Sequence, residues 1–154
     1  MGSQVKAICR ATADDTLDVL RMTERAYEAG GHSVYMGEYD HARMDVLVAH
    51  LIDDDDADIF IAKDGDEALG MVALAMSHVV ISADYSMAQE ITWWVEPDHR
   101  ENGIGERLLE AALEWAHSRD VHLWMSAPKA SQSIAQMCVK RGFRLLESIY
   151  IKGA

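Results

Sequence analysis

A chain of 154 residues has the length of one ordinary domain, so the sequence predicts a single domain over residues 1–154. Hydrophobic residues make up 49% and charged residues 26% of the chain, a balance that excludes a disordered or fibrous protein. The net charge of −12 opposes binding to nucleic acid or to an anionic membrane and agrees with a cationic partner such as an amine.

Cysteine and histidine usage gives no sign of a metal site. Cys9 and Cys138 are too few for a disulfide framework or for a four-thiolate zinc site. The seven histidines never recur at the i, i+4 spacing of a helical zinc pair, so no metal is expected. No leader pattern or membrane-spanning run is found either, and the sequence therefore predicts a cytoplasmic protein.

The first third of the chain predicts one strand and two helices. Residues 5–10 resemble a short strand. Apolar residues at helical spacing predict a helix ended by the glycine pair at 30–31, and a second helix from about residue 44. The acidic run at 53–56 ends the second helix and lacks the spaced ligands of a calcium loop, so it is interpreted as a solvated turn.

Three strands are predicted next. Residues 58–63 and 68–78 are joined by a tight-turn sequence at 64–66, which indicates an antiparallel hairpin. Residues 87–96 are rich in strand formers and are closed by Pro97.

The remaining elements alternate between helix and strand. We expect a helix over 103–117, a short strand over 121–125, a helix over 131–141 and a final strand over 143–152. The whole order predicts a mixed α/β protein in which helices pack against one central sheet.

A glycine-containing turn lies between the third of these strands and its following helix and reads Arg100-Glu101-Asn102-Gly103-Ile104-Gly105. Gly103 and Gly105 remove side chains where backbone must approach a ligand, while the helix start directs free N–H groups outward. Such a corner suits a pyrophosphate, to which Arg100 adds a charge-assisted contact. No Walker loop is present, and Leu108 stands where a dinucleotide fingerprint needs its third glycine. The alternative that the glycines only permit a tight turn stays open at this point.

With its surroundings, this turn resembles the GCN5-related N-acetyltransferases, in which the pattern [RQ]-x-x-G-x-[GA] binds the pyrophosphate of acetyl-coenzyme A. Here the pattern is Arg100-x-x-Gly103-x-Gly105. Residues 91–99 are similar to the strand and turn that precede it in the family, and Lys140-Arg141-Gly142-Phe143 is similar to a late family signature. The element order agrees with the family from about residue 5 to residue 152.

The resemblance implies a mostly antiparallel sheet with helices on both faces and a splayed parallel strand pair. It also implies acetyl-coenzyme A as co-substrate, its pantetheine arm lying beside the backbone of Trp94, Val95 and Glu96. An N–H near Val95 would stabilise the oxyanion on the thioester carbonyl. The diphosphate would be held by residues of the glycine turn, namely Arg100, Glu101, Asn102, Gly103, Ile104 and Gly105.

Glu90 is the candidate general base, because some family members carry a catalytic glutamate at this position. Strand alternation predicts that Glu90 shares one face with Thr92, Trp94 and Glu96. The alternative is that Glu90 is simply a solvated residue at a strand start.

The candidate acid departs from the family. Many members place an asparagine at the start of the late helix and, seven residues on, a tyrosine that protonates the leaving thiolate; those positions hold Ser131 and Cys138. The Cys138 thiol is a candidate proton donor, and Ser131 a candidate cofactor contact as a helix cap. The alternative for Cys138 is a small buried helix residue, with the thiolate leaving by help from water or a backbone N–H.

Together these features predict direct acetyl transfer from acetyl-coenzyme A to a primary amine of a small molecule or peptide. Two alternatives remain: a non-catalytic acyl-coenzyme A sensor or partner-binding module, and a different phosphate-ligand enzyme. The oligomeric state is left open, and a homodimer is a candidate because dimers are common among members of the family.

Overall fold

The computed structural model of the chain describes residues 7–79, 82, 84–128 and 131–152. Its strands are β1 (Ala7–Arg10), β2 (Ala57–Asp64), β3 (Glu67–His78), β4 (Ser86–Val95) and β5 (Leu123–Trp124). Its helices are α1 (Thr16–Ala29), α2 (Ser33–Met36), α3 (His41–Asp53), α4 (Ile104–Ser118) and α5 (Gln132–Lys140), with short 3-10 turns at Ala13–Asp15 and Pro97–His99.

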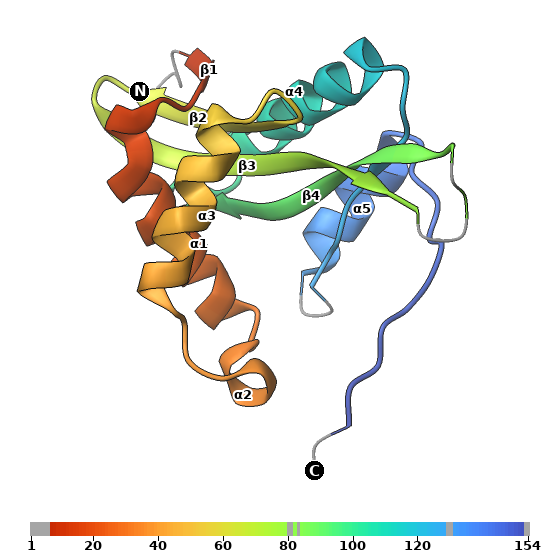
Figure 1. Cartoon of the computed structure of the whole chain (residues 1–154), viewed down its shortest axis with the longest axis horizontal. Helices are drawn as coiled ribbons and strands as arrows, with labels where there is room; N and C mark the ends of the chain where they lie inside the picture. The colour runs from red at the N-terminus through yellow and green to blue at the C-terminus, as the bar shows by residue number, and fades with distance from the viewer. Residues whose placement is uncertain (1–6, 80–81, 83, 129–130, 153–154) are drawn as a thin grey trace.

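The five strands form one sheet in the order β1-β2-β3-β4-β5. All neighbours are antiparallel except β4 and β5, which run parallel and pair at only two positions, Ala88 with Leu123 and Gln89 with Trp124. Figure 1 shows the long β3 and β4 ribbons crossing the middle of the molecule. The predicted mixed, mostly antiparallel sheet with a parallel strand pair is therefore confirmed.

Helices cover both faces of the sheet and divide the core in two (Figure 1). On one face, α1 and α3 bury Val19 and Val48 against Ile61 and Met71 of the sheet. On the other face, α4 buries a row of apolar side chains, including Leu108, against the opposite side of the same strands. Strand alternation explains the division, because successive side chains point to opposite faces.

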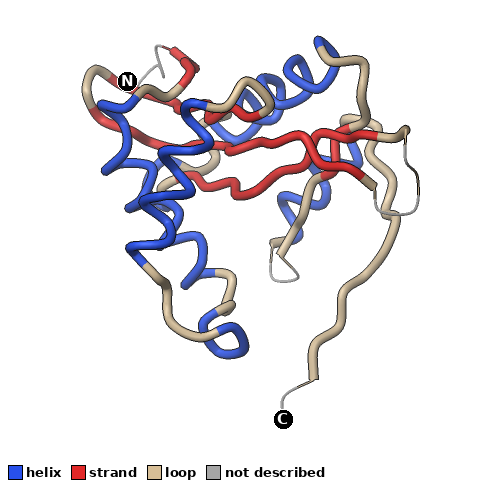
Figure 2. The backbone as a smooth tube through the Cα atoms, in the orientation of Figure 1, coloured by secondary structure: helices blue, strands red, loops and turns tan. Residues whose placement is uncertain are grey.

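Most predicted elements are present, with three differences. The short helix α2 was not predicted, and β5 has two residues where five were expected. Residues 143–152, predicted as a final strand, form no secondary structure and run as a loop to the C-terminal end in Figure 2. A strand needs a hydrogen-bonded neighbour, and no described strand pairs with this segment. Part of the first predicted strand, residues 5–6, lies outside the described residues.

Candidate active site

A β-bulge in β4 sets the geometry of the site. The β3–β4 register passes from Ala73 opposite Thr92 to Leu74 opposite Glu90, so Ile91 is an extra residue without a partner. Side chains on the two sides of Ile91 therefore follow different alternations.

The bulge places Glu90 on the opposite face from Trp94. Glu90 lies opposite Leu74, whose side chain belongs to the core under α4. Trp94 packs instead against the core under α1 and α3. The prediction that Glu90, Thr92, Trp94 and Glu96 share one face is thus wrong for Glu90, because strict alternation does not hold across a bulge.

Beyond the bulge, one edge of β4 is open. β5 pairs with β4 only at Ala88 and Gln89, so along the described chain no strand lies beside the later part of β4 on that side. Glu96 donates its N–H to Leu69 O at 2.8 Å, which makes the neighbouring pair of Val95 and Gly70 a non-hydrogen-bonded one. The N–H and C=O of Val95 therefore point away from β3, into the open side.

The three residues expected to lie beside the pantetheine arm, Trp94, Val95 and Glu96, therefore direct their main-chain groups differently. Val95 directs its N–H to the open side, as expected. The N–H of Glu96 is already used within the sheet, and by alternation the main-chain groups of Trp94 also face β3. Glu96 does not offer the free amide that the resemblance implied.

The open edge leads directly into the glycine turn. Gly103 is the N-cap of α4 and has a φ of +77°, in the left-handed region that favours glycine. Glu101 also has a positive φ, of 67°, which is uncommon for a residue with a side chain. Glu101, Asn102 and Gly103 are exposed, while Ile104 is buried in the core and fixes the helix start. The first N–H groups of α4 are thus presented at the end of β4.

Arg100 lies across the end of β4 rather than over the helix start. Its Nε donates to Val95 O at 3.0 Å, and its guanidinium lies 4.7 Å from the centre of a Trp94 ring. The side chain is exposed, so it stays accessible to an anion.

The indole of Trp93 packs beside Gly105, the second glycine of this turn. Trp93 Nε1 is a buried donor without a hydrogen-bond partner, the one buried side-chain nitrogen or oxygen in that condition among the described residues. A Cβ at Gly105 would lie 3.6 Å from Trp93 Cζ2 and 3.5 Å from Met137 Cε, so the indole covers the second glycine of the turn. Because an unpaired buried donor is costly, this place favours a ligand that brings an acceptor oxygen.

Glu90 has the properties of a base that works near neutral pH. Burial raises its pKa to about 7, although the N–H of Ser126 donates to Glu90 Oε2 at 3.1 Å and acts in the opposite direction. A carboxyl with such a pKa is substantially ionised at neutral pH and can still accept a proton readily.

Cys138 and Ser131 lie on or beside α5. Cys138 is buried, and its pKa is raised by burial and by the charge of Glu90, so the thiol stays protonated at neutral pH. Sequence-distant Glu90 and Cys138 are thereby brought within electrostatic reach of each other. Ser131 is the N-cap of α5, but its side chain makes no capping hydrogen bond and its Oγ lies 3.4 Å from Ser133 Oγ.

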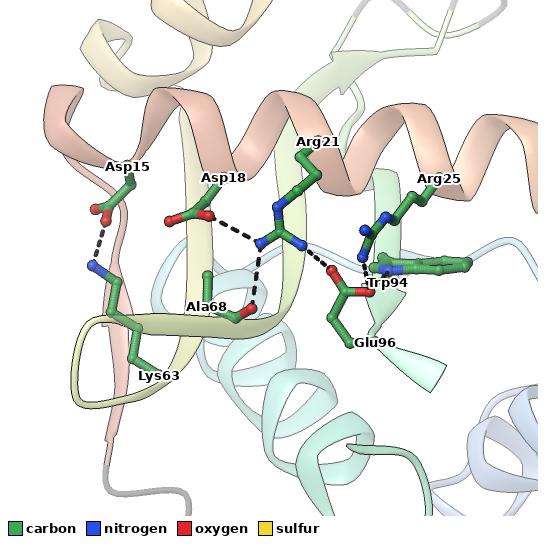
Figure 3. Close-up of polar contacts among 8 residues, drawn as sticks. All are labelled: Asp15, Asp18, Arg21, Arg25, Lys63, Ala68, Trp94 and Glu96. Carbon is green, nitrogen blue, oxygen red and sulfur yellow. Dashed lines mark hydrogen bonds and ion pairs between the residues drawn. The ribbon is translucent and has the colours of Figure 1, made fainter. Parts of the chain in front are cut away.

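Glu96 is held by two arginines of α1 (Figure 3). Arg21 Nη1 and Arg25 Nη1 donate to its two carboxylate oxygens, the second at 2.6 Å, and Trp94 Nε1 donates at 3.3 Å. Burial acts to raise the pKa of Glu96, but hydrogen bonds from Arg25 and Trp94 and the charges of both arginines leave it below its ordinary value. Glu96 is therefore ionised at neutral pH and fixes the end of β4 to α1, a contact that we call the Glu96 clamp.

Sequence reasoning missed the two arginines of the Glu96 clamp. Arg21 also donates to Asp18 Oδ1 at 2.9 Å, a pair three residues apart on α1 that the sequence could have indicated. Nothing in the local pattern indicates the contact of Arg21 or Arg25 with Glu96, which is more than 70 residues away in the chain.

The model of the acetyltransferase (GNAT) family matches residues 18–143, which is most of the chain. The chain belongs to the GNAT acetyltransferase family. A comparison with curated proteins finds no match.

Solved structures share the fold of this GNAT chain at low sequence identity. The aminoglycoside N-acetyltransferase AAC(6')-Iy, in complex with the bisubstrate analogue CoA-S-monomethyl-acetylneamine, has a TM-score of 0.72 and 16% identity, with 96% of this chain and 97% of that chain covered. A predicted acetyltransferase from Clostridium acetobutylicum, with acetyl-CoA, has a TM-score of 0.76 and 16% identity, covering 96% and 95%. A ribosomal-protein-alanine N-acetyltransferase from Brucella melitensis has a TM-score of 0.68 and 17% identity, covering 96% and 99%.

None of the described helices is sufficiently long and apolar to cross a bilayer. No group of three or more histidine, cysteine or acidic side chains in the described part of the chain is arranged to hold a metal ion.

Proposed function

We propose that this GNAT chain transfers an acetyl group from acetyl-coenzyme A directly to a primary amine of a small molecule or peptide. The observation that carries the proposal is the open edge of β4, which leads from the bulge at Ile91 past Val95 into the turn at Gly103. Main-chain groups of such an edge can pair with the amides of a pantetheine arm, and the helix start after it can bind a diphosphate.

The residues beside this edge fit the co-substrate. Exposed Arg100 and the N–H groups at the start of α4 supply positive charge and donors for the diphosphate. Trp93 Nε1 supplies a buried donor that has no acceptor in the described chain. Acetyl-coenzyme A brings phosphate and carbonyl oxygens to these donors and supplies the acetyl group as a thioester.

Each step of the transfer has a residue that suits it. Glu90, with a pKa of about 7, accepts a proton from the acceptor ammonium or amine, directly or through water. The Val95 N–H donates to the carbonyl oxygen of the thioester as negative charge develops there. The protonated Cys138 thiol is the candidate donor to the leaving thiolate, and Ser131 a candidate contact with the co-substrate.

The acceptor is proposed to be cationic. A net charge of −12 raises the local concentration of amines, which are protonated at neutral pH. AAC(6')-Iy was solved with the bisubstrate analogue CoA-S-monomethyl-acetylneamine. This finding concerns that protein and supports an amine acceptor for this chain by analogy. We place the single 1–154 domain in the cytoplasm, since its two cysteines are both unpaired.

The test is a screen of amines with acetyl-coenzyme A that measures thiol release, followed by Glu90→Gln. The variant is expected to lower kcat/KM by about a hundredfold or more and to leave the affinity for acetyl-coenzyme A within about threefold. In the unsubstituted enzyme, kcat/KM should rise with pH through about 7, because the base must lose its proton.

Glu67→Gln, an exposed residue at the start of β3, is the matched control and should keep full activity. Full activity of Glu90→Gln would remove the proposed base. Tight binding of acetyl-coenzyme A with no turnover across the panel would favour the sensor alternative. Equal affinity for a nucleotide without a pantetheine arm would favour a different phosphate-ligand enzyme.

A further inference from the structure

The main-chain oxygen of Val95 is already occupied by the chain itself. Val95 turns its C=O toward the open side of β4, because the pair that it forms with Gly70 is a non-hydrogen-bonded one. Arg100 Nε donates to this oxygen at 3.0 Å. A guanidinium of the chain therefore covers an acceptor of the open edge, beside which the pantetheine arm is proposed to lie.

A tight turn brings Arg100 back to the strand that precedes it. Residues Pro97–His99 form one 3-10 turn, after which Arg100 donates its N–H to Pro97 O at 3.3 Å. The turn starts at the proline, whose fixed φ favours this conformation. Arg100 is thus held beside the end of β4, at a place from which its side chain reaches Val95.

Trp94 provides a platform for the same side chain. The Arg100 guanidinium lies 4.7 Å from the centre of a Trp94 ring, a distance at which a cation is attracted to the ring face. Trp94 is itself held, since its Nε1 donates to Glu96 Oε2 at 3.3 Å within the Glu96 clamp (Figure 3). The two contacts give Arg100 one defined position across the end of β4.

That position leaves the charge of Arg100 without an anion. Both contacts are with uncharged groups, and within the described part of the chain no carboxylate pairs with Arg100. A diphosphate is a better partner, because it is fully charged and accepts two parallel N–H bonds from one guanidinium. The N–H groups that α4 presents from Gly103 onward suit a diphosphate only three residues along the chain from Arg100.

The two partners of Arg100 lie on opposite faces of the sheet. Trp94 packs against the core under α1 and α3, whereas Ile104 at the start of α4 belongs to the core on the other face. A guanidinium that forms two bonds with a diphosphate at the start of α4 must therefore leave Trp94 and release Val95 O. Arg100 is exposed, so this movement disturbs no packed core.

We infer that Arg100 makes the site selective for acyl donors that carry a diphosphate, because it covers Val95 O in the free chain and is withdrawn when a diphosphate binds at the start of α4. A pantetheine arm without that group must displace Arg100 and brings no new partner for the guanidinium. The site therefore discriminates acyl-coenzyme A from donors that have a pantetheine arm alone. The inference rests on the proposed function and adds the means by which the donor is selected.

The test compares coenzyme A with pantetheine, which lacks the diphosphate, by NMR titration in the absence of an acceptor. In Arg100→Ala the Kd of coenzyme A should rise about tenfold, because the diphosphate loses a charged partner. The Kd of pantetheine should fall about threefold or more, because Val95 O is then uncovered. Arg43→Ala removes the same charge from an exposed position on α3; it is the matched control and should leave both Kd values nearly unchanged.

The indole N–H signal of Trp94 reports where Arg100 lies. Saturating coenzyme A should move this signal toward its position in free Arg100→Ala, since both changes take the guanidinium away from the ring. A Trp94 signal that coenzyme A leaves in place would overturn the inference.

The two ligands also separate this inference from the proposed function. Pantetheine that binds Arg100→Ala no more tightly than it binds the unsubstituted chain, or that binds neither protein, would overturn the selectivity while binding of coenzyme A still supports the acetyltransferase. An unsubstituted chain that does not bind coenzyme A would overturn both.

Discussion

Two glutamates six residues apart have opposite chemistry because their surroundings differ. Glu90 is half-buried with one main-chain donor, Ser126, and desolvation raises its pKa to about 7. Glu96 is buried with two arginines, and its pKa falls. Residue type alone gives both side chains the same pKa, so only the tertiary contacts separate a base from a structural anion.

Glu90→Gln should make the protein more stable at alkaline pH. The folded-state pKa of Glu90 lies above the unfolded one, so the unfolded state binds fewer protons between pH 4.5 and about 7, and stability falls as pH rises through that window. The substitution removes this cost, and a gain on the order of 1–3 kcal/mol is expected at pH 8.

Denaturant unfolding of both proteins at pH 5 and pH 8 checks this outcome. The gain should shrink toward pH 5, where Glu90 is protonated in the folded state. An equal difference at both pH values would show that ionisation of Glu90 is not its cause.

Glu96→Gln should have the opposite pH dependence. The lowered pKa of Glu96 means that its ion pairs stabilise the fold above the unfolded pKa and lose this contribution as pH falls through the folded pKa. Because both arginines are partly exposed, we expect a loss of about 1–3 kcal/mol at pH 7 that becomes smaller toward pH 4. Thermal melts of the variant and of Asp98→Asn, an exposed control, measure it; an unchanged melting temperature for Glu96→Gln would contradict the role given to the clamp.

At the scale of the element, β4 combines two side-chain alternations in one strand. The strand itself was predictable from its β-formers, and its observed bounds differ by one residue at each end from the prediction. The bulge was not predictable, because Ile91 is an ordinary strand residue and no glycine marks the irregularity. The prediction of the sheet face on which Glu90 lies was wrong because of this bulge alone.

Val95→Pro tests the main-chain donor at the open edge. Val95 makes no ladder hydrogen bond with its N–H, so proline removes the donor without breaking the sheet. We expect kcat to fall by about a hundredfold to a thousandfold while circular dichroism stays close to that of the unsubstituted chain.

Trp94→Pro is the companion variant. Its N–H faces β3, so the same substitution one residue earlier should unfold the strand rather than spare it. Val95→Pro with normal kcat would mean that the oxyanion is stabilised by another group.

The final predicted strand illustrates a different limit. Residues 143–152 have the composition and alternation of a strand, and these patterns report what a segment prefers when a neighbour is present. They contain no information about whether the single chain supplies that neighbour. The order of the other predicted elements and the predicted glycine turn agree with the structure. Helical periodicity and the glycine motif were therefore more reliable indicators than the strand pattern of residues 143–152.

Across the whole molecule, the net charge of −12 acts differently on the two proposed substrates. Acetyl-coenzyme A is an anion and is repelled by the field of the protein, whereas an ammonium acceptor is attracted. Raising the ionic strength from about 20 to 200 mM should lower KM for acetyl-coenzyme A and raise KM for a cationic acceptor, each by roughly twofold to fivefold.

Steady-state kinetics with both substrates varied will measure the two constants. An acceptor of zero net charge is the control and should show little change in KM. Movement of both constants in the same direction would show that local contacts, rather than the overall field, control the encounter.

The short pairing between β4 and β5 has a consequence for ligand entry. Residue pairs at Ala88 and Gln89 are the sole strand pairing between β5 and the four-stranded antiparallel part, among the described residues. The antiparallel strands are joined along most of their length, whereas the parallel pair is joined at two positions at one end, so few main-chain hydrogen bonds link β5 to β4. A long ligand can therefore enter beside β4 beyond Gln89 without breaking any strand pairing between β4 and β5.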